Sequence, residues 1–220
     1  MVHPHVVLVG YPSSRIFILK QKRSLNSARK IIMPEYFAAV TIVILIGMVL
    51  TRAFMMKRIG IAAFNFGKID KTDFLIPPFA FFYFYLVFAN SFGLPTVSRQ
   101  EFFRSEVIPW IGALFCLAGL TLLLLSLISF GKSFRVGIDT DHPDKLITSG
   151  VFAISRNPIY VAFGSVLLGQ FLIFPNWILL IYLGAAIWLF HRQILREEDY
   201  LKNHYGKEYS DYCYRVRRYF

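Results

Sequence analysis

Five long apolar runs, separated by polar stretches, dominate the hydrophobic pattern of this chain. An α-helix rises about 1.5 Å per residue, so roughly 20 apolar residues cross the hydrocarbon core of a bilayer. The runs that are long enough, or nearly so, are Tyr36 to Thr51, Phe74 to Leu94, Val107 to Phe130, Pro158 to Pro175 and Asn176 to His191. The pattern predicts an all-α, polytopic membrane protein with about five transmembrane helices.

The junctions between these runs carry recognisable helix signals. Pro175-Asn176 alone separates the last two runs, which predicts a tight turn between two antiparallel helices. Pro77-Pro78 should start or kink the second helix. The first run is slightly short, and it extends through Met56 if Arg52 snorkels to the interface. Beyond the last run, polar residues keep a helical spacing, so we expect a C-terminal helical tail in the cytoplasm.

Composition supports this assignment. The 220 residues are 56% hydrophobic and 17% charged, with a mean hydropathy of +0.52, which is too apolar for a soluble domain of this size. The net charge is +11, but the basic residues flank apolar runs without forming an aromatic-interleaved patch. We therefore expect the lipid bilayer and its anionic headgroups as partners, and no nucleic acid.

The remaining composition adds few constraints. Cys116 lies in an apolar run and Cys213 in the polar tail, which indicates neither a disulfide framework nor a zinc site. We expect one membrane domain over residues 35–220, after a basic tail over residues 1–34. This tail shows no secretory signal, and it is read as solvated or as an organelle transit segment. The oligomeric state cannot be inferred from these features.

The distribution of Lys and Arg predicts an orientation. With five crossings, the first loop, the third loop and the C-terminal tail share one face, and they carry twice as many Lys and Arg residues as the other face. The positive-inside rule then places the third loop and the C-terminal tail in the cytoplasm. The basic N-terminal tail argues for the opposite orientation, and we follow the total.

The third loop, residues 131–157, is the first segment with candidate chemistry. A group of acids and one histidine there invites a metal site, but this spacing before a helix is more typical of turns and caps, so we expect no metal. The residues are Asp139, Asp141, His142 and Asp144. Pro158 suits a first helical turn, which leaves Asn157 as a helix N-cap and Arg156 at the positive end of the helix. Interfacial snorkelling would explain Arg156 by itself, but the companion residues favour contact with a cofactor.

The polar segment after the last apolar run is the second candidate. Surface ion pairs alone would explain its charged residues at helical spacing, which are Arg192, Arg196, Glu197 and Glu198. A carboxylate pair so close to a membrane helix is nevertheless costly unless it is solvated, paired or binding a cation. A sulfonium cofactor would supply a cation. The tail also carries tyrosines that are typical interfacial anchors and together could roof a pocket, at positions Tyr200, Tyr205, Tyr209, Tyr212 and Tyr214.

In combination these motifs resemble the integral-membrane isoprenylcysteine carboxyl methyltransferase and phospholipid methyltransferase family. The similarity lies in Leu146 to Tyr160, Glu197 to Leu201 and Tyr205 to Tyr212, within residues 131–216. It implies S-adenosylmethionine as the methyl donor, bound between the third loop and the tail. Consistently, the chain has no glycine-rich strand-to-helix fingerprint of a Rossmann-type cofactor site.

The resemblance also assigns residues to roles. The implied cofactor-binding residues are Leu146, Gly150, Val151, Asn157, Tyr160 and Glu198. The candidate catalytic residues are Arg156, Arg192 and Glu197, with the two arginines orienting the cofactor carboxylate or the acceptor. Asn157 stands where many members have histidine. Asparagine keeps the hydrogen bonds of histidine but cannot carry a proton at neutral pH, so no role as a base is expected of it.

Methyl transfer from a sulfonium is an in-line displacement, and an ionised carboxylate acceptor needs no general base. We therefore expect carboxyl O-methylation of a lipophilic, isoprenylcysteine-like acceptor. N-methylation of a phospholipid amine is the alternative, and it would need a proton acceptor such as His142, His191 or His204. Asp211 to Val216 also resembles the ending of NADPH-dependent sterol reductases, and a non-catalytic membrane protein is a further alternative.

Overall fold

The computed structural model describes residues 12–58, 76–96, 101–130 and 146–220, with the backbone alone for residues 12–33 and 76–77. Over these ranges the chain is helical, and its β-structure is limited to one bridge between Glu101 and Asn176. The elements are α1 (Pro12–Arg58), α2 (Ile76–Phe92), α3 (Ile108–Phe130), η3 (Gly150–Ala153, a 3₁₀ turn), α4 (Pro158–Ile173), α5 (Trp177–Tyr205) and α6 (Lys207–Arg215). The all-α prediction is confirmed for the described residues.

Three helical segments are long and apolar enough to cross a membrane, namely Pro34–Arg58, Ile108–Phe130 and Trp177–Tyr205. Two further apolar helices, Pro78–Phe92 and Pro158–Ile173, are shorter than this requirement. The first segment extends beyond Arg52 as predicted, with Ala53 and Met56 buried. A membrane protein is therefore supported, and the count of five crossings stays a prediction.

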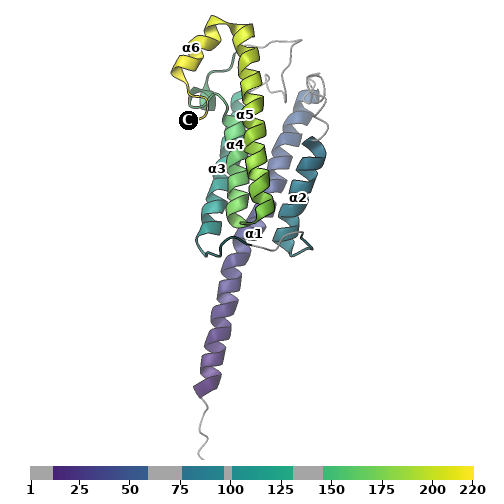
Figure 1. Cartoon of the computed structure of the whole chain (residues 1–220), viewed down its shortest axis with the longest axis vertical. Coiled ribbons are helices and arrows are strands. Elements are labelled where there is room, and N and C mark those ends of the chain that lie inside the picture. Colours follow the sequence, from purple (N-terminus) through teal and green to yellow (C-terminus); the bar gives the residue numbers. More distant parts are fainter. Residues whose placement is uncertain (1–11, 59–75, 97–100, 131–145) are drawn as a thin grey trace, which may run out of the picture.

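Helix α1 is longer than the sequence pattern predicts. It runs without interruption through 47 residues, including Pro34, and its N-terminal part projects beyond the bundle (Figure 1). Residues 12–34 of the predicted basic tail are therefore helical and continuous with the first apolar segment. Residues 1–11 lie outside the described part of the chain.

A seam of small residues brings α3 and α4 into close contact. A Cβ atom added to Gly112 would lie 2.6 Å from the carbonyl oxygen of Gly169, and one added to Gly119 would lie 2.7 Å from that of Ala162. Such small residues let the backbones of membrane helices approach each other. The seam therefore fixes where α4 begins relative to the end of α3.

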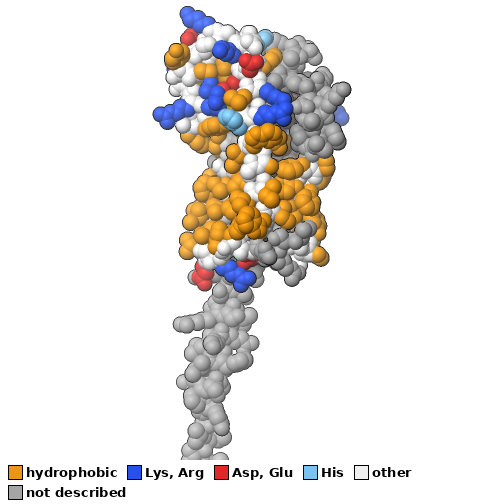
Figure 2. Space-filling model, viewed as in Figure 1, with side chains coloured by type: hydrophobic (Ala, Val, Ile, Leu, Met, Phe, Trp, Pro, Cys, Tyr) orange, Lys and Arg blue, Asp and Glu red, His pale blue; other side chains and the backbone are white. Residues whose placement is uncertain are grey.

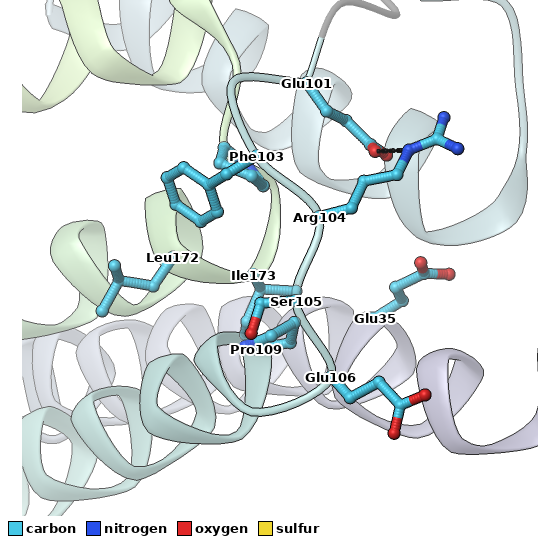
Figure 3. A pocket seen from close by; sticks show the side chains of 10 residues that line it. Glu35, Glu101, Phe103, Arg104, Ser105, Glu106, Pro109, Leu172 and Ile173 are labelled. Atoms are coloured by element: carbon cyan, nitrogen blue, oxygen red, sulfur yellow. Dashed lines mark hydrogen bonds and ion pairs between the residues drawn. The ribbon is translucent and has the colours of Figure 1, made fainter. Parts of the chain in front are cut away.

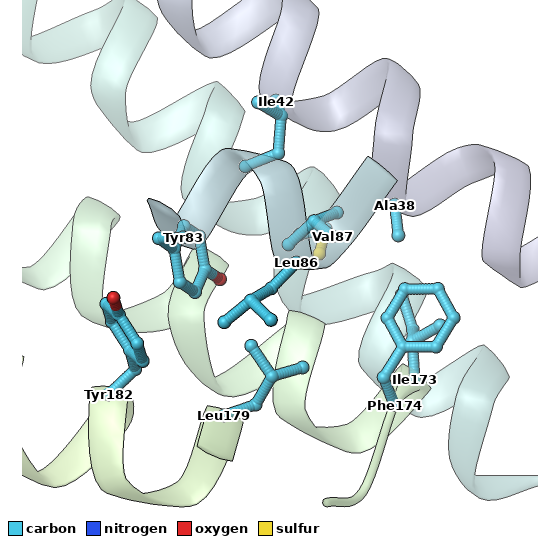
Figure 4. Close-up of a cluster of buried hydrophobic side chains, with 10 residues drawn as sticks. Ala38, Ile42, Tyr83, Leu86, Val87, Ile173, Phe174, Leu179 and Tyr182 are labelled. Carbon is cyan, nitrogen blue, oxygen red and sulfur yellow. The ribbon is translucent and has the colours of Figure 1, made fainter. Parts of the chain in front are cut away.

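A hydrophobic cluster joins α2 to the start of α5 and to α1 (Figure 4). In it, the rings of Tyr83 and Tyr182 lie 5.4 Å apart, and Leu179 is buried beside them. The neighbouring aromatic side chains of α2, such as Phe81, are exposed, as is typical of side chains that face lipid. At the start of α5, the Asn176 side chain accepts a hydrogen bond from the Leu179 backbone N–H at 3.0 Å, which caps the helix.

The beginning of α4 lies against the C-terminal part of α5. The rings of Tyr160 and Phe190 are 5.6 Å apart, and α4 and α5 run side by side in Figure 1. Charged side chains gather at the end of the bundle where α5 leads into α6, beside a broad hydrophobic band (Figure 2). This end, called the polar end below, holds the motif residues.

Candidate functional site

The loop before α4 is anchored on α3 and α6. Gly150 has a φ of +63°, and a Cβ atom there would lie 2.4 Å from the Ser129 hydroxyl oxygen of α3. Both facts explain why glycine stands at this position. The Phe152 ring packs edge-on against Phe130 at 4.7 Å, and the Tyr212 hydroxyl of α6 donates to the Phe152 carbonyl at 2.6 Å. The loop thus reaches α4 in a fixed conformation.

Residues 216–220, the C-terminal strap, lie along this loop. The backbone N–H of Arg156 donates to the carbonyl of Arg217 at 3.0 Å. The side-chain amide of Asn157 and the hydroxyl of Ser155 donate to the carbonyl of Arg218 at 3.2 and 3.4 Å. The strap therefore contributes to the polar end as much as the loop motif does.

Glu198 of α5 is the centre of the site, and it is 9% exposed. Its Oε1 accepts a hydrogen bond from Asn157 Nδ2 at 3.2 Å and lies 3.6 Å from Arg156 Nη2. Its Oε2 accepts two bonds from Arg218, from Nε at 3.0 Å and Nη2 at 2.8 Å. A buried carboxylate is costly unless it is paired and hydrogen-bonded, and here both oxygens meet that condition.

Arg156 connects this carboxylate to α6. Its Nη1 donates to the Cys213 sulfur, and its Nη2 faces Glu198. Its Nε is buried and has no hydrogen-bond partner among the described residues. Buried donors without a partner are rare in proteins, so this nitrogen is a candidate for contact with a bound molecule.

An open hollow of about 480 Å³ lies over these groups. Three cationic and two acidic side chains line it, together with tyrosines and smaller residues: Arg156, Leu195, Glu198, Asp199, Lys202, Tyr209, Ser210, Cys213, Tyr214 and Arg218. Burial raises the pKa of Tyr212, just behind this wall, to about 12 and also raises the pKa of Tyr209. Both phenols are therefore neutral donors near pH 7. The hydrogen bond to Glu198 raises the pKa of Arg218.

Glu197 occupies a different environment from Glu198. Its Oε1 accepts hydrogen bonds from the Tyr160 hydroxyl at 2.6 Å and from Gln193 Nε2 at 3.1 Å. Neither Glu197 nor Tyr160 lines the hollow. The two adjacent glutamates of the motif thus belong to two separate polar groups.

The other predicted site residues lie outside the hollow. Leu146 packs against Tyr209 and Tyr212, and the Val151 carbonyl accepts backbone bonds within the loop. The Arg192 guanidinium lies over the Trp188 ring, 5.8 Å from its centroid. The structure therefore brings together Arg156, Asn157 and Glu198, and it places Leu146, Gly150 and Val151 behind them as support.

One expectation about the loop is corrected by the structure, and another concerns residues outside the described part. Asn157 occupies the N-cap position of α4, but its side chain makes no capping bond, because Glu198 and the strap engage the amide. The acidic loop residues Asp139, Asp141, His142 and Asp144 lie outside the described residues. Within the described ranges, no group of three His, Cys, Asp or Glu residues could hold a metal ion.

Sequence reasoning missed Arg218 and Cys213 as members of the site. Arg217 and Arg218 have the composition of an ordinary basic tail, and no helical spacing relates them to Glu198. The only available signal was that the polar segment continues beyond the matched motifs.

A second hollow, of about 330 Å³, lies where α3 begins and α4 ends (Figure 3). Glu35, Glu101 and Glu106 border it, and Arg104 Nε pairs with Glu101 Oε2 at 2.8 Å. Both partners of this ion pair are largely exposed, so it contributes little to stability. This hollow contains none of the motif residues.

Residues 107–208 match the sequence model of the phospholipid methyltransferase family. The matched segment includes α3, the third loop, α4 and α5, and with them Arg156, Asn157 and Glu198. The family resemblance is confirmed over these residues. No solved structure matches the chain.

Curated relatives agree with this match. Protein-S-isoprenylcysteine O-methyltransferase B of Arabidopsis thaliana is 33% identical over 108 residues, which are 44% of this chain and 55% of the relative. The enzymes named protein-S-isoprenylcysteine O-methyltransferase in Dictyostelium discoideum and Rattus norvegicus are 31% and 30% identical, over 47% and 50% of this chain and 45% and 40% of their own lengths. The chain spans about half the length of these relatives. Both comparisons relate the chain to proteins that are named as methyltransferases.

Proposed function

We propose that this chain transfers the methyl group of S-adenosylmethionine to a lipophilic acceptor at the membrane interface. The most strongly supported reaction is carboxyl O-methylation of an isoprenylcysteine-like substrate. The observation that carries the proposal is the convergence of two separated motifs, Arg156-Asn157 and Glu198, at one hollow on the polar end of an apolar helix bundle. The names of the relatives support the choice of acceptor.

The residues of the hollow fit an adenosyl amino acid. Such a molecule has a planar base, an ammonium group and a carboxylate, so it needs charged partners of both signs and an aromatic or apolar surface. The lining side chains provide charges of both signs, and Tyr209 and Leu195 provide the surface. When bound, S-adenosylmethionine supplies a methyl group on a sulfonium, and the protein has to hold that methyl group in line with the acceptor.

The acceptor side involves a different set of residues in this proposal. Glu197 and Tyr160 lie on α5 and α4 next to the hollow, and Trp188 with Arg192 lies further along α5. Trp188 is 62% exposed, as expected for a side chain at the level of the lipid headgroups. A prenylated acceptor would approach along this part of α5, with its carboxylate directed toward the hollow.

Phospholipid N-methylation is the second candidate, because the matching family model is named for it. An amine acceptor must lose a proton, and no histidine among the described residues lines the hollow. His191 Nδ1 is bonded to the Tyr219 hydroxyl at 2.6 Å, and His204 packs against Tyr200 and Tyr205. These contacts favour a carboxylate acceptor, which needs no base. We also propose that the hollow faces the cytoplasm, on the basis of the distribution of positive charge.

A labelling experiment tests this proposal. The purified full chain in lipid nanodiscs is given methyl-labelled S-adenosylmethionine with either N-acetyl-S-farnesylcysteine or phosphatidylethanolamine. We expect label in the first acceptor, as a methyl ester that base releases as methanol. Base-stable label in the phospholipid would assign the N-methyltransferase reaction instead. Label in neither acceptor, with no binding of S-adenosylhomocysteine, would contradict the proposed function.

A further inference from the structure

Arg218 is the second arginine of the hollow, and its position indicates how the site recognises a ligand. We propose that Arg156 and Arg218 together form the subsite for the carboxylate of the bound amino-acid tail, and that Glu198 is the counter-ion that positions both guanidinium groups. This inference rests on the proposed function and deepens it. It also gives Arg218 the role that the sequence resemblance assigned to Arg192.

Glu198 already has protein partners on both of its carboxylate oxygens. Oε2 accepts two hydrogen bonds from Arg218, and Oε1 accepts one from Asn157 while it faces Arg156. The carboxylate is also 9% exposed. A ligand cation would have to compete with these two arginines for the same carboxylate. Glu198 is therefore better placed to orient arginines than to bind a cation itself.

Both arginines keep N–H donors that no described residue of the protein uses. A guanidinium carries five N–H donors, and Glu198 takes two of those of Arg218. Arg156 uses Nη1 on Cys213 and turns Nη2 toward Glu198, and its buried Nε has no partner among the described residues. Both side chains line the hollow. The donors that remain on these two guanidinium groups can form charge-assisted hydrogen bonds with an anionic ligand.

The side chains that line the hollow carry a net positive charge. The cationic side chains are Arg156, Lys202 and Arg218, and the acidic ones are Glu198 and Asp199, which leaves one excess positive charge. Planar guanidinium groups match the two oxygens of a carboxylate, and such bonds are shorter and stronger than neutral ones. In an adenosyl amino acid the α-carboxylate is the one anionic group. The hollow therefore favours that end of the molecule near the two arginines.

The test compares two ligands that differ in the carboxylate alone. Binding of S-adenosylhomocysteine and of its decarboxylated analogue, which keeps the amine, is measured by calorimetry on the full chain in nanodiscs. The proteins are wild type, Arg218→Gln, Arg218→Lys and, as a matched control, Arg217→Gln, whose side chain is exposed and does not line the hollow.

We expect wild type to prefer S-adenosylhomocysteine by about tenfold or more, the scale of one charge-assisted hydrogen bond. Arg218→Gln should lower the affinity for S-adenosylhomocysteine about tenfold. The affinity for the decarboxylated analogue should stay within about twofold of wild type, so the preference disappears. Arg218→Lys keeps the charge without the planar fork and should recover part of the loss. Arg217→Gln should change neither affinity.

Other results would overturn the inference in distinguishable ways. Equal losses for both ligands in Arg218→Gln and Arg218→Lys would show a purely structural role. Tighter binding of either ligand in Arg218→Gln would show that Arg218 occupies the place of a ligand cation on Glu198. Equal affinities of wild type for both ligands would mean that the carboxylate is not recognised, while the proposed function stands. Binding of neither ligand by wild type would overturn the proposed function as well.

Discussion

Glu197 and Glu198 are neighbours in sequence, yet they lie in two different regions of the polar end. Glu198 points to the loop and the C-terminal strap, where Asn157, Arg156 and Arg218 surround it. Glu197 points to α4, where Tyr160 hydrogen-bonds to it. Adjacent helical residues differ by roughly 100° in direction, which is enough to separate them. The paired glutamates of the motif are thus two units, one that builds the hollow and one that ties α5 to α4.

The largest effect on cofactor binding should come from removing the carboxylate of Glu198. Glu198→Ala leaves two guanidinium groups near each other without their counter-ion, and breaking a buried pair in this way costs about 3–5 kcal/mol. We expect S-adenosylhomocysteine affinity to fall about a hundredfold, measured by calorimetry in nanodiscs, with a lower melting temperature. Glu208→Gln, an exposed change on α6, is the control. Wild-type affinity in Glu198→Ala would show that the hollow is not the cofactor site.

Asn157→Ala should have the next largest effect. The change removes the amide that bridges Glu198 and the Arg218 carbonyl, two hydrogen bonds worth about 1 kcal/mol each. We expect about a tenfold loss of S-adenosylhomocysteine affinity and a chain that remains folded by circular dichroism. Asn157→His, which retains donor and acceptor groups, should bind better than Asn157→Ala. If Asn157→Ala and wild type bound equally, the bridge would not shape the site.

The helices and the meeting of the two motifs could be predicted from the sequence. The apolar runs predicted the helices because burial in lipid requires long uninterrupted hydrophobic segments, and α3 and α4 begin within one residue of the expected positions. The motifs predicted that the loop before α4 would meet the end of α5.

The contribution of the C-terminal strap to the site could not be predicted from the sequence. Its residues have no periodic pattern, and their position depends on the turn at Gly206, where φ is +52°, and on the docking of Tyr212 on Phe152. Asn157 was predicted as a helix cap from local sequence, but partners far away in the chain engage its amide. Long-range contacts of this kind carry no local signal, which is why Arg218 was missed.

Changes in the region of Glu197 and Tyr160 should affect stability more than cofactor binding. Tyr160→Phe removes the hydrogen bond to Glu197 and should lower the free energy of unfolding by about 1 kcal/mol. S-adenosylhomocysteine affinity should stay within about twofold of wild type, measured in the same nanodiscs. A tenfold or greater loss of affinity would mean that the two glutamates act as one site after all.

The smallest effect concerns the tyrosine that docks α6 on the loop. Burial raises the pKa of Tyr212 to about 12, above the value of about 10 for an unfolded chain. Because the folded state holds this proton more tightly, its contribution to stability is complete below about pH 10 and is lost as the pH rises toward 12. Chemical unfolding from pH 8 to 12 should show this decline, and it should be weaker in Tyr212→Phe. An identical decline in both proteins would assign it to other groups.

We propose above that the hollow between Arg156 and Glu198 holds the methyl donor. A structure of the full chain in nanodiscs with S-adenosylhomocysteine, determined by electron cryomicroscopy, would locate this ligand. We expect ligand density in this hollow, with the ligand carboxylate in hydrogen-bonding range of Arg156. Density at the opposite end of the bundle, beside Glu35 and Glu101, or in a crevice that Glu198 does not border, would contradict it.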